Sequence, residues 1–191
     1  VQDWGAQPAA LLLNPQASER VFDACSAPGG KTGHILELAD VALLALDVHA
    51  KRLRRVAENV ERLVLPARLQ AADASKLDGW YDGVQFDAVL ADVPCTASGV
   101  VKRHPDIKWL RRKTDAQSVA LQQHQMLDVL WSTVKVGGRM LLATCSVFPE
   151  ENQQQLQAML SRHANARLRL EEQLLPNDAQ DGFYYALIDK V

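Results

Sequence analysis

The sequence lacks the features that mark several broad protein classes. Its 191 residues include three cysteines, Cys25, Cys95 and Cys145, and no CxxC pair. A structural zinc site is therefore not expected, and three thiols cannot all pair in disulfides, which fits a reducing cytoplasm. The apolar runs are far too short to cross a membrane, and no signal peptide is visible.

Charge of one sign is also missing. The formal net charge is −2, so no global basic field indicates a nucleic-acid partner. The hydrophobic fraction of 48% is typical of a folded soluble protein. The length favours one domain, which we assign to residues 1–191. The sequence begins with Val1 rather than Met, and the first predicted helix starts at residue 2. We therefore expect further residues upstream.

The apolar pattern alternates between strands and helices. Residues 41–46 form a continuous apolar run, as in a strand buried on both faces, whereas 49–63 has the three-and-four spacing of an amphipathic helix. This alternation predicts an α/β fold with a mostly parallel sheet and helices on both faces. The expected strands are 20–25, 41–46, 68–72, 86–91 and 139–143, with edge strands at 167–170 and 183–188. The expected helices are 2–13, 33–39, 49–63, 114–134 and 149–162.

The turn after the first strand is rich in small residues. Gly29 and Gly30 let a ligand approach the backbone at a helix N-terminus. The turn is neither GxGxxG nor GxxxxGK[ST], which argues against a dinucleotide or a triphosphate. Asp47, Asp73 and Asp92 follow the next three strands, at the edge where open α/β sheets bind ligands. Together these features predict a nucleoside-type cofactor and favour S-adenosylmethionine.

Two thiols also follow strand ends. Cys25 fits a buried packing role, but Cys95 and Cys145 open a loop and a turn, where a thiol can face a pocket. A thiolate that adds to C6 of a pyrimidine makes C5 nucleophilic enough to take a methyl group. Asp92 is placed to stabilise charge developing on the ring. Spacing alone does not decide which thiol attacks.

Three motifs together resemble the RNA cytosine-5 methyltransferases: residues 23–32 (DACSAPGGKT), 92–95 (DVPC) and 144–152 (TCSVFPEEN). The resemblance covers nearly the whole chain. Residues 103–109 (RHPDIKW) and Gln2-Asp3 are similar to the bacterial branch that methylates cytosine 967 of 16S rRNA. Ser26 and Trp4-Gly5 depart from the usual pattern, but neither change removes a reactive group.

The resemblance implies a Rossmann-like S-adenosylmethionine-dependent methyltransferase fold and a NusB-like RNA-binding domain upstream. It implies that Cys145 is the nucleophile and that Cys95 assists product release. It also implies a monomer without a metal, acting on a loop or single-stranded cytosine. The implied cofactor-binding residues are Cys25, Ser26, Ala27, Pro28, Gly29, Gly30, Lys31, Asp47, Asp73 and Asp92.

A locally basic segment follows Cys95, from Lys102 to Lys113, with Asp106 as its one acid. Such a run is often only a solvated helix face, but its position favours contact with RNA phosphates and bases. The expected RNA-binding residues are Lys102, Arg103, His104, Lys108, Trp109, Arg111 and Arg112. The alternatives are another rRNA or tRNA target, a non-catalytic RNA-binding module, and a nucleotide-dependent oxidoreductase.

Overall fold

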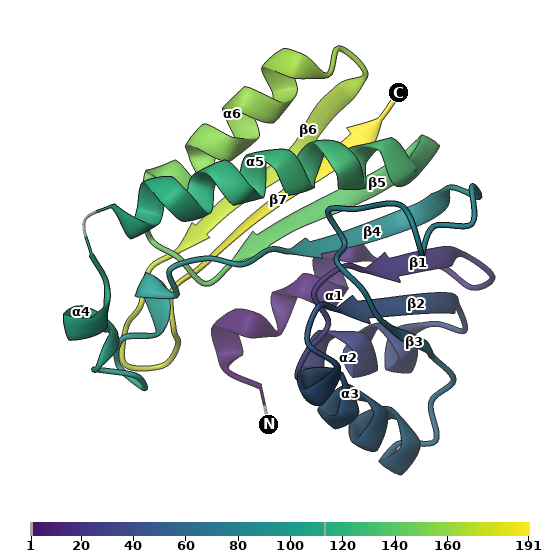
Figure 1. Ribbon diagram of the computed structural model, residues 1–191, viewed down its shortest axis with the longest axis horizontal. Helices are drawn as coiled ribbons and strands as arrows, with labels where there is room; N and C mark the ends of the chain where they lie inside the picture. The colour runs from purple at the N-terminus through teal and green to yellow at the C-terminus, as the bar shows by residue number, and fades with distance from the viewer. Residues whose placement is uncertain (1, 113) are drawn as a thin grey trace.

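The computed structural model describes residues 2–112 and 114–191, whose strands form one seven-stranded sheet (Figure 1). The strand order is β3-β2-β1-β4-β5-β7-β6. Strands β1 to β5 run parallel, and β7 runs antiparallel to both of its neighbours. The bounds are β1 (Arg20–Asp23), β2 (Ala42–Asp47), β3 (Arg68–Ala71), β4 (Phe86–Asp92), β5 (Val134–Thr144), β6 (Ala166–Leu174) and β7 (Phe183–Lys190).

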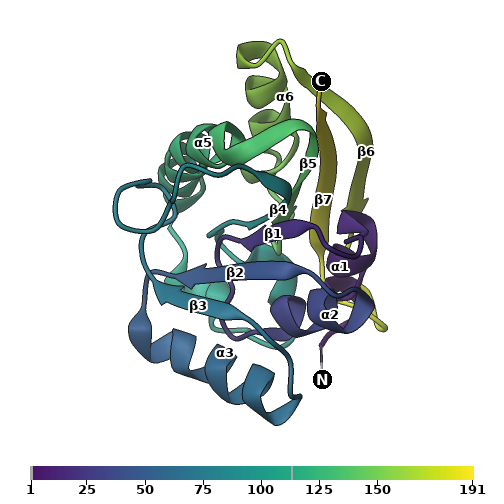
Figure 2. The ribbon, with the colours of Figure 1, turned by 90° about the vertical axis from the view of Figure 1, so that its right-hand side faces the viewer.

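Helices cover both faces of the sheet, so the predicted α/β architecture is confirmed. Figure 2 shows α1 (Pro8–Leu13), α2 (Gly30–Leu38) and α3 (Ala50–Arg62) on one side, with α5 (Asp115–Thr133) and α6 (Gln153–Arg162) on the other. Shorter elements are α4 (Ile107–Leu110) and the 3₁₀ turns η1 (Trp4–Ala6), η2 (Ser98–Val100) and η3 (Pro149–Glu151). None of the helices in the described part is long and apolar enough to cross a membrane.

Alternation along the central strands builds two cores. In β2, Leu44 and Leu46 join the core under α5 and α6, whereas Leu43 and Ala45 join the core under α1, α2 and α3. Successive side chains of a strand point to opposite faces, so a continuous apolar run fills both layers. The apolar stripe of α3, centred on Val56, packs into the second core.

Several predicted boundaries were wrong. The expected opening helix is a 3₁₀ turn followed by α1, with Pro8 at the first helical position. Strand β5 begins at Val134, directly after α5, and runs through Gly137-Gly138, where we expected a break. Asn152 interrupts the helix expected from 149 to 162. Strand β7 is an interior strand between β5 and β6, so only β6 lies at the predicted edge.

The fold gathers the carboxyl ends of β1, β2, β4 and β5 along one edge of the sheet. Asp23, Asp47 and Asp92 are the last residues of β1, β2 and β4, and Cys145 follows β5 directly. In a parallel sheet these ends face the same crevice.

Candidate active site

The turn between β1 and α2 forms the floor of this crevice. Gly29 has φ +100°, a left-handed conformation that favours glycine, and its amide donates to the Ser26 carbonyl at 2.7 Å. A Cβ on Gly30 would lie 2.5 Å from Nε2 of Gln2, so the opening segment passes directly over the turn. The turn is therefore closely held between α3 and the start of the chain.

Two adjacent cavities open at the turn, and both are lined by Cys25, Ala27 and Asp92. The first, of about 280 Å³, also contacts Asp23 and Lys31. The second, of about 330 Å³, extends from the turn to further acids that follow strands and to the two thiols that follow β4 and β5. Its lining includes Asp47, Asp73, Cys95 and Cys145.

Asp47 and Asp73, two of the three acids that line the second cavity, are held in different ways. Asp47 is buried, accepts a hydrogen bond from the amide of His49 at 2.9 Å and lies 3.5 Å from the guanidinium of Arg52. Asp73 lies two residues beyond β3 and accepts hydrogen bonds from the amide and hydroxyl of Ser75. The hydroxyl of Ser75 holds the pKa of Asp73 below its usual value. Both carboxylates are thus available as hydrogen-bond acceptors for hydroxyl or amine groups.

Asp23 was not among the predicted site residues. It is 1% exposed, and its Oδ2 accepts from the Thr32 hydroxyl at 2.7 Å while its Oδ1 has no partner. Burial raises its pKa to about 7. An unpartnered buried carboxylate oxygen beside a cavity indicates a binding position for a donor. The strand-end signal that selected Asp47 and Asp92 would also have selected Asp23.

The two predicted reactive thiols lie in contact. Sγ of Cys95 and Sγ of Cys145 are 3.3 Å apart, and one thiol donates to the other. This hydrogen bond lowers the pKa of Cys145, against the effect of burial, and raises the pKa of Cys95. Burial raises the pKa of the third thiol, Cys25. Because a thiolate is the nucleophilic form, Cys145 is the more readily activated of the three.

Lys31 forms an ion pair with Asp92 rather than facing the turn alone. Its Nζ lies 2.7 Å from Oδ2 of Asp92, with side chains 15% and 25% exposed. Burial lowers the pKa of Lys31, but the Asp92 carboxylate outweighs burial, so the pKa is raised overall. The pair keeps a fixed positive and negative charge beside the two cavities.

The predicted RNA-binding residues divide into separate groups. Lys102 and Arg103 pair with Asp178 and Asp181 in the loop between β6 and β7. Three other cations, Lys108, Arg111 and Arg112, line a third cavity of about 510 Å³, which also contacts Thr96 and Ser98 of the Cys95 loop.

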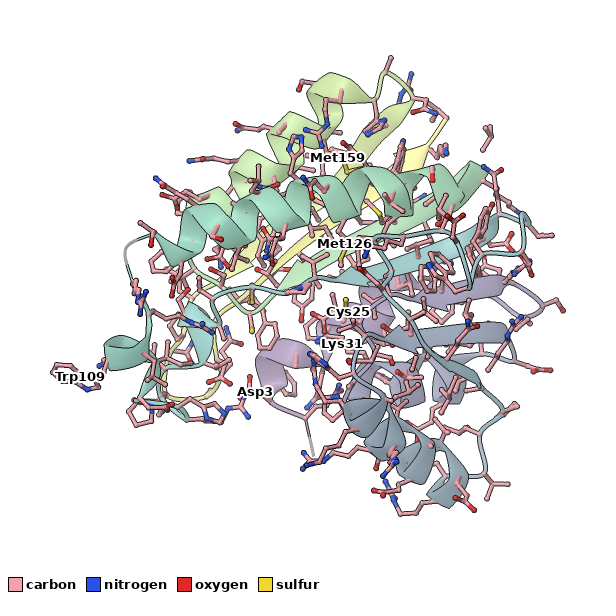
Figure 3. All side chains as sticks on the ribbon, in the orientation of Figure 1. Asp3, Cys25, Lys31, Trp109, Met126 and Met159 are labelled. Carbon is pink, nitrogen blue, oxygen red and sulfur yellow. The ribbon has the colours of Figure 1, made fainter. Side chains whose placement is uncertain are left out.

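The remaining residues of the basic segment lie outside these groups. His104 is exposed, and Trp109 is 88% exposed and points away from the body of the molecule (Figure 3). Lys113 lies outside the described residues. Figure 3 also places Cys25 and Lys31 near each other in the middle of the molecule.

The fold therefore brings together the residues predicted for the cofactor and for catalysis, but not all of those predicted for RNA. The two cavities share Cys25, Ala27 and Asp92 in their walls, and the second is also lined by Asp47, Asp73 and both strand-end thiols. Within residues 2–112 and 114–191, no group of three His, Cys, Asp or Glu side chains is placed to hold a metal ion.

Known proteins are similar to this chain in sequence and in structure. The model of the family described as 16S rRNA methyltransferase RsmB/F matches residues 10–189. The ribosomal RNA small subunit methyltransferase B of Shewanella oneidensis is 48% identical over 202 residues, which cover 100% of this chain and 47% of that protein. The chain thus spans about half the length of the curated relatives that it matches.

Solved structures agree over the whole chain. PH0851 superposes with a TM-score of 0.95 at 32% identity, covering 100% of this chain and 46% of that one. NSun6 from Pyrococcus horikoshii, solved with SFG, superposes with a TM-score of 0.91 at 27% identity, covering 100% and 52%. The predicted methyltransferase fold is confirmed, and the chain belongs to the 16S rRNA methyltransferase RsmB/F family.

Proposed function

We propose that this chain is the catalytic portion of an enzyme that transfers a methyl group from S-adenosylmethionine to C5 of a cytosine in 16S rRNA, at position 967. The thiol pair carries this proposal. A contact of 3.3 Å between Cys95 and Cys145, with the pKa of one thiol lowered and that of the other raised, suits a nucleophile and its proton-transfer partner. The 16S rRNA methyltransferase family to which the chain belongs, and its curated relatives named as small subunit rRNA methyltransferases, support the 16S rRNA substrate.

The residues present fit the proposed cofactor. The unpartnered Oδ1 of Asp23 suits the ammonium group of the methionine moiety, and the acceptors of Asp47 and Asp73 suit ribose hydroxyls and the adenine amine. Residues Cys25 to Lys31 of the turn, apart from Gly29, line the first cavity together with Asp23. S-adenosylmethionine, when bound, supplies an electrophilic methyl group. The structure of NSun6 from Pyrococcus horikoshii was solved with SFG, which supports ligand binding by this chain.

Cys145 is the proposed nucleophile because its pKa is lowered. Its Sγ forms a bond to C6 of the cytosine, and the ring electrons move to C5, which then carries the new methyl group. Once Sγ of Cys145 is a thioether, it no longer accepts a proton-sharing bond from Cys95. The main cause of the raised pKa of Cys95 is thereby removed. The pKa of Cys95 then falls, so its thiol loses its proton to solvent. The resulting Cys95 thiolate takes the C5 proton, and the C6–Sγ bond breaks with its electrons returning to Cys145 as a thiolate, which releases the methylated product.

Asp92 and Lys31 have a proposed role at the polar edge of the cytosine. Addition at C6 makes N3 of the ring more basic, and a carboxylate can accept from the protonated N3 and from the exocyclic amine. Lys31 lies 2.7 Å from Asp92 and so holds that carboxylate in a fixed orientation. This arrangement stabilises the adduct more than the free base.

The third cavity is the proposed contact with flanking RNA. Lys108, Arg111 and Arg112 rim it, and Phe148, three residues after Cys145, lines it with an exposed aromatic ring. Nε of Arg111 donates to the carbonyl of Thr96 at 2.8 Å, which joins this rim to the loop that carries Cys95. Cations suit phosphates, and an aromatic face suits an unstacked base.

The test uses unmodified 16S rRNA with radiolabelled S-adenosylmethionine and three variants of the chain: Cys145→Ser, Cys95→Ser and, as a matched control, Cys25→Ser. We expect Cys145→Ser to abolish methylation and Cys95→Ser to accumulate a covalent protein–RNA band on a denaturing gel. Cys25→Ser should accumulate no covalent band, because the hydrogen-bonded thiols are Cys95 and Cys145. Its methylation rate reports on cofactor binding, since Cys25 lines both cavities.

A reversed pattern would assign the nucleophile to Cys95. In that reversed pattern, Cys145→Ser accumulates the covalent protein–RNA band and Cys95→Ser does not. If no variant and no native chain labels rRNA, even when the segment upstream in its relatives is restored, the proposed reaction is wrong.

A further inference from the structure

The segment Glu150-Glu151-Asn152 closes the third of the motifs, and the proposed reaction assigns it no role. It lies at the end of η3, just before α6. Glu151 and Asn152 are both 0% exposed. Neither lines the two cavities at the β1–α2 turn. A buried carboxylate beside a buried amide requires partners, and those partners identify what the pair does.

Glu151 holds the loop that carries Cys95. One carboxylate oxygen accepts from the amide of Thr96 at 2.7 Å, and the other accepts from the hydroxyl of Thr96 at 2.7 Å. Thr96 is the residue directly after Cys95 and is itself 1% exposed. Two charge-assisted hydrogen bonds to one residue fix both its backbone and its side chain.

Asn152 holds the turn that carries Cys145. Its Oδ1 accepts from the hydroxyl of Thr144 at 2.6 Å, and its Nδ2 donates to the carbonyl of Ser146 at 2.9 Å. Thr144 and Ser146 flank Cys145 on either side. Nδ2 also donates to Gln173 of β6 at 2.8 Å, which ties the turn to the sheet.

We propose that Glu151 and Asn152 are a pair of positioning residues that set the distance between the two reactive thiols. Two consecutive residues hold the two loops, so the separation of Cys95 and Cys145 is fixed within one short stretch of backbone. The amide of Gly99 supports the same register by donating to the carbonyl of Cys145 at 2.9 Å. Proton sharing between the thiols depends on their 3.3 Å contact, and the pair acts on the reaction through that contact.

The use of this geometry in catalysis rests on the proposed function, but its test needs no RNA. The rate of alkylation by iodoacetamide is measured from pH 5 to pH 10 for each cysteine by mass spectrometry, in the full 191-residue chain. In Glu151→Ala, Cys145 should lose its hydrogen bond from Cys95. The midpoint of its alkylation should move to higher pH, and its rate at pH 7 should fall by about threefold or more, since one pKa unit is tenfold in thiolate population.

The direction of the shift separates position from charge. Removing a negative charge near a thiol, without moving the thiol, would lower its pKa. The matched control Glu150→Ala removes the neighbouring carboxylate, whose side chain makes no hydrogen bond or ion pair among the described residues. It should leave the Cys145 midpoint unchanged or slightly lower. Cys25, whose pKa is raised by burial, should be slow to alkylate in every sample, and faster alkylation of it would reveal loss of the fold.

Conservative variants complete the test. In Glu151→Gln the side-chain oxygen can still accept from the Thr96 amide, and its NH₂ can donate to the Thr96 hydroxyl, so thiol reactivity should return close to that of the native chain. Thr96→Val keeps one of the two hydrogen bonds and should be intermediate. If Glu151→Ala does not fold, the remaining three proteins decide the matter. The pH midpoint of Cys145 alkylation should rise in the order native chain, Glu151→Gln, Thr96→Val. Identical Cys145 profiles in the native chain and in Thr96→Val or folded Glu151→Ala would overturn the proposal.

Discussion

At Asp23 a carboxylate is kept where burial opposes its charge. The raised pKa, about 7, means that the folded chain binds a proton more tightly at Asp23 than the unfolded chain does, for which the ordinary value is 3.8. Its favourable contribution to folding is fully present below about pH 4 and is lost as pH rises through 7. The unpartnered Oδ1 is the atom that we assign to a cationic ligand group. The charged form of Asp23 therefore destabilises the fold but is the form that binds the ligand.

We therefore expect Asp23→Asn to be more stable than the native chain at pH 8. The amide is uncharged at every pH and can still accept from Thr32. The gain in the free energy of unfolding should be about 1–3 kcal/mol at pH 8 and should shrink towards zero near pH 4. Urea unfolding at the two pH values measures the difference. The same variant should lose affinity for S-adenosylmethionine in calorimetry.

The exposed Asp40 provides the control, since its side chain makes no hydrogen bond in the described part of the chain. Asp40→Asn should show neither a pH-dependent gain nor a loss of ligand affinity. A stability difference for Asp23→Asn that does not change with pH would contradict the assigned burial of charge.

Among the elements, η2 is the place where three loops meet. A Cβ on Gly99 would lie 2.3 Å from the carbonyl oxygen of Gly182 and 2.9 Å from that of Cys145. Both obstacles are backbone and cannot rotate away. Gly99→Ala should therefore destabilise the fold by about 1–3 kcal/mol and reduce the reactivity of Cys145, because the loops must separate. Thermal unfolding and iodoacetamide labelling measure the two effects.

Gly33 in α2 is the matched glycine for this comparison. A Cβ there would meet only Cδ1 of Leu63 at 3.5 Å, an ordinary contact. Gly33→Ala should be neutral or stabilising by up to about 1 kcal/mol, since alanine favours a helix interior. Equal losses of stability in Gly99→Ala and Gly33→Ala would show that the close backbone contacts of η2 are not the reason why position 99 requires glycine.

The elements also mark where sequence reasoning succeeds. β2 and β4 were predicted within a residue or two because their runs are apolar throughout and end in aspartate. The start of β5 was missed because Gly137, with φ +81°, sits inside a strand whose pairing with β4 shifts register there. The interior place of β7 depends on which strand pairs with β5, and no local pattern encodes that choice.

The site shows the same division. The acids and thiols predicted at strand ends lie together at one edge of the sheet, because chain order and strand direction place them there, although Asp23 at the end of β1 was missed. The contact between the thiols and the roles of Glu151 and Asn152 depend on side-chain packing between loops about 50 residues apart, for example between Thr96 and Glu151. The pairing of Arg103 with Asp181, 78 residues away, likewise could not be inferred from a run of basic residues.

For the whole molecule, the charge distribution matters more than the net charge of −2. Lys108, Arg111 and Arg112 line one cavity, whereas Lys102 and Arg103 are already paired with aspartates. Binding that rests mainly on phosphate contacts by these few cations predicts weak RNA binding that weakens further as salt rises. Filter binding that is tight and insensitive to salt would contradict this expectation.

The proposed cavity rim makes a sharper prediction about that salt dependence. Each phosphate contact removed from a single-stranded partner should reduce the slope of log K against log salt by about 0.7. Arg112→Gln should weaken binding of an unmodified 16S rRNA fragment by a similar factor across sequences and reduce the slope by about that amount. Arg169→Gln removes the same charge from β6, where Arg169 pairs with Asp189, and should leave the slope unchanged. If both variants change the slope equally, the cavity beside Phe148 is not where the RNA backbone lies, because the effect then follows net charge rather than position.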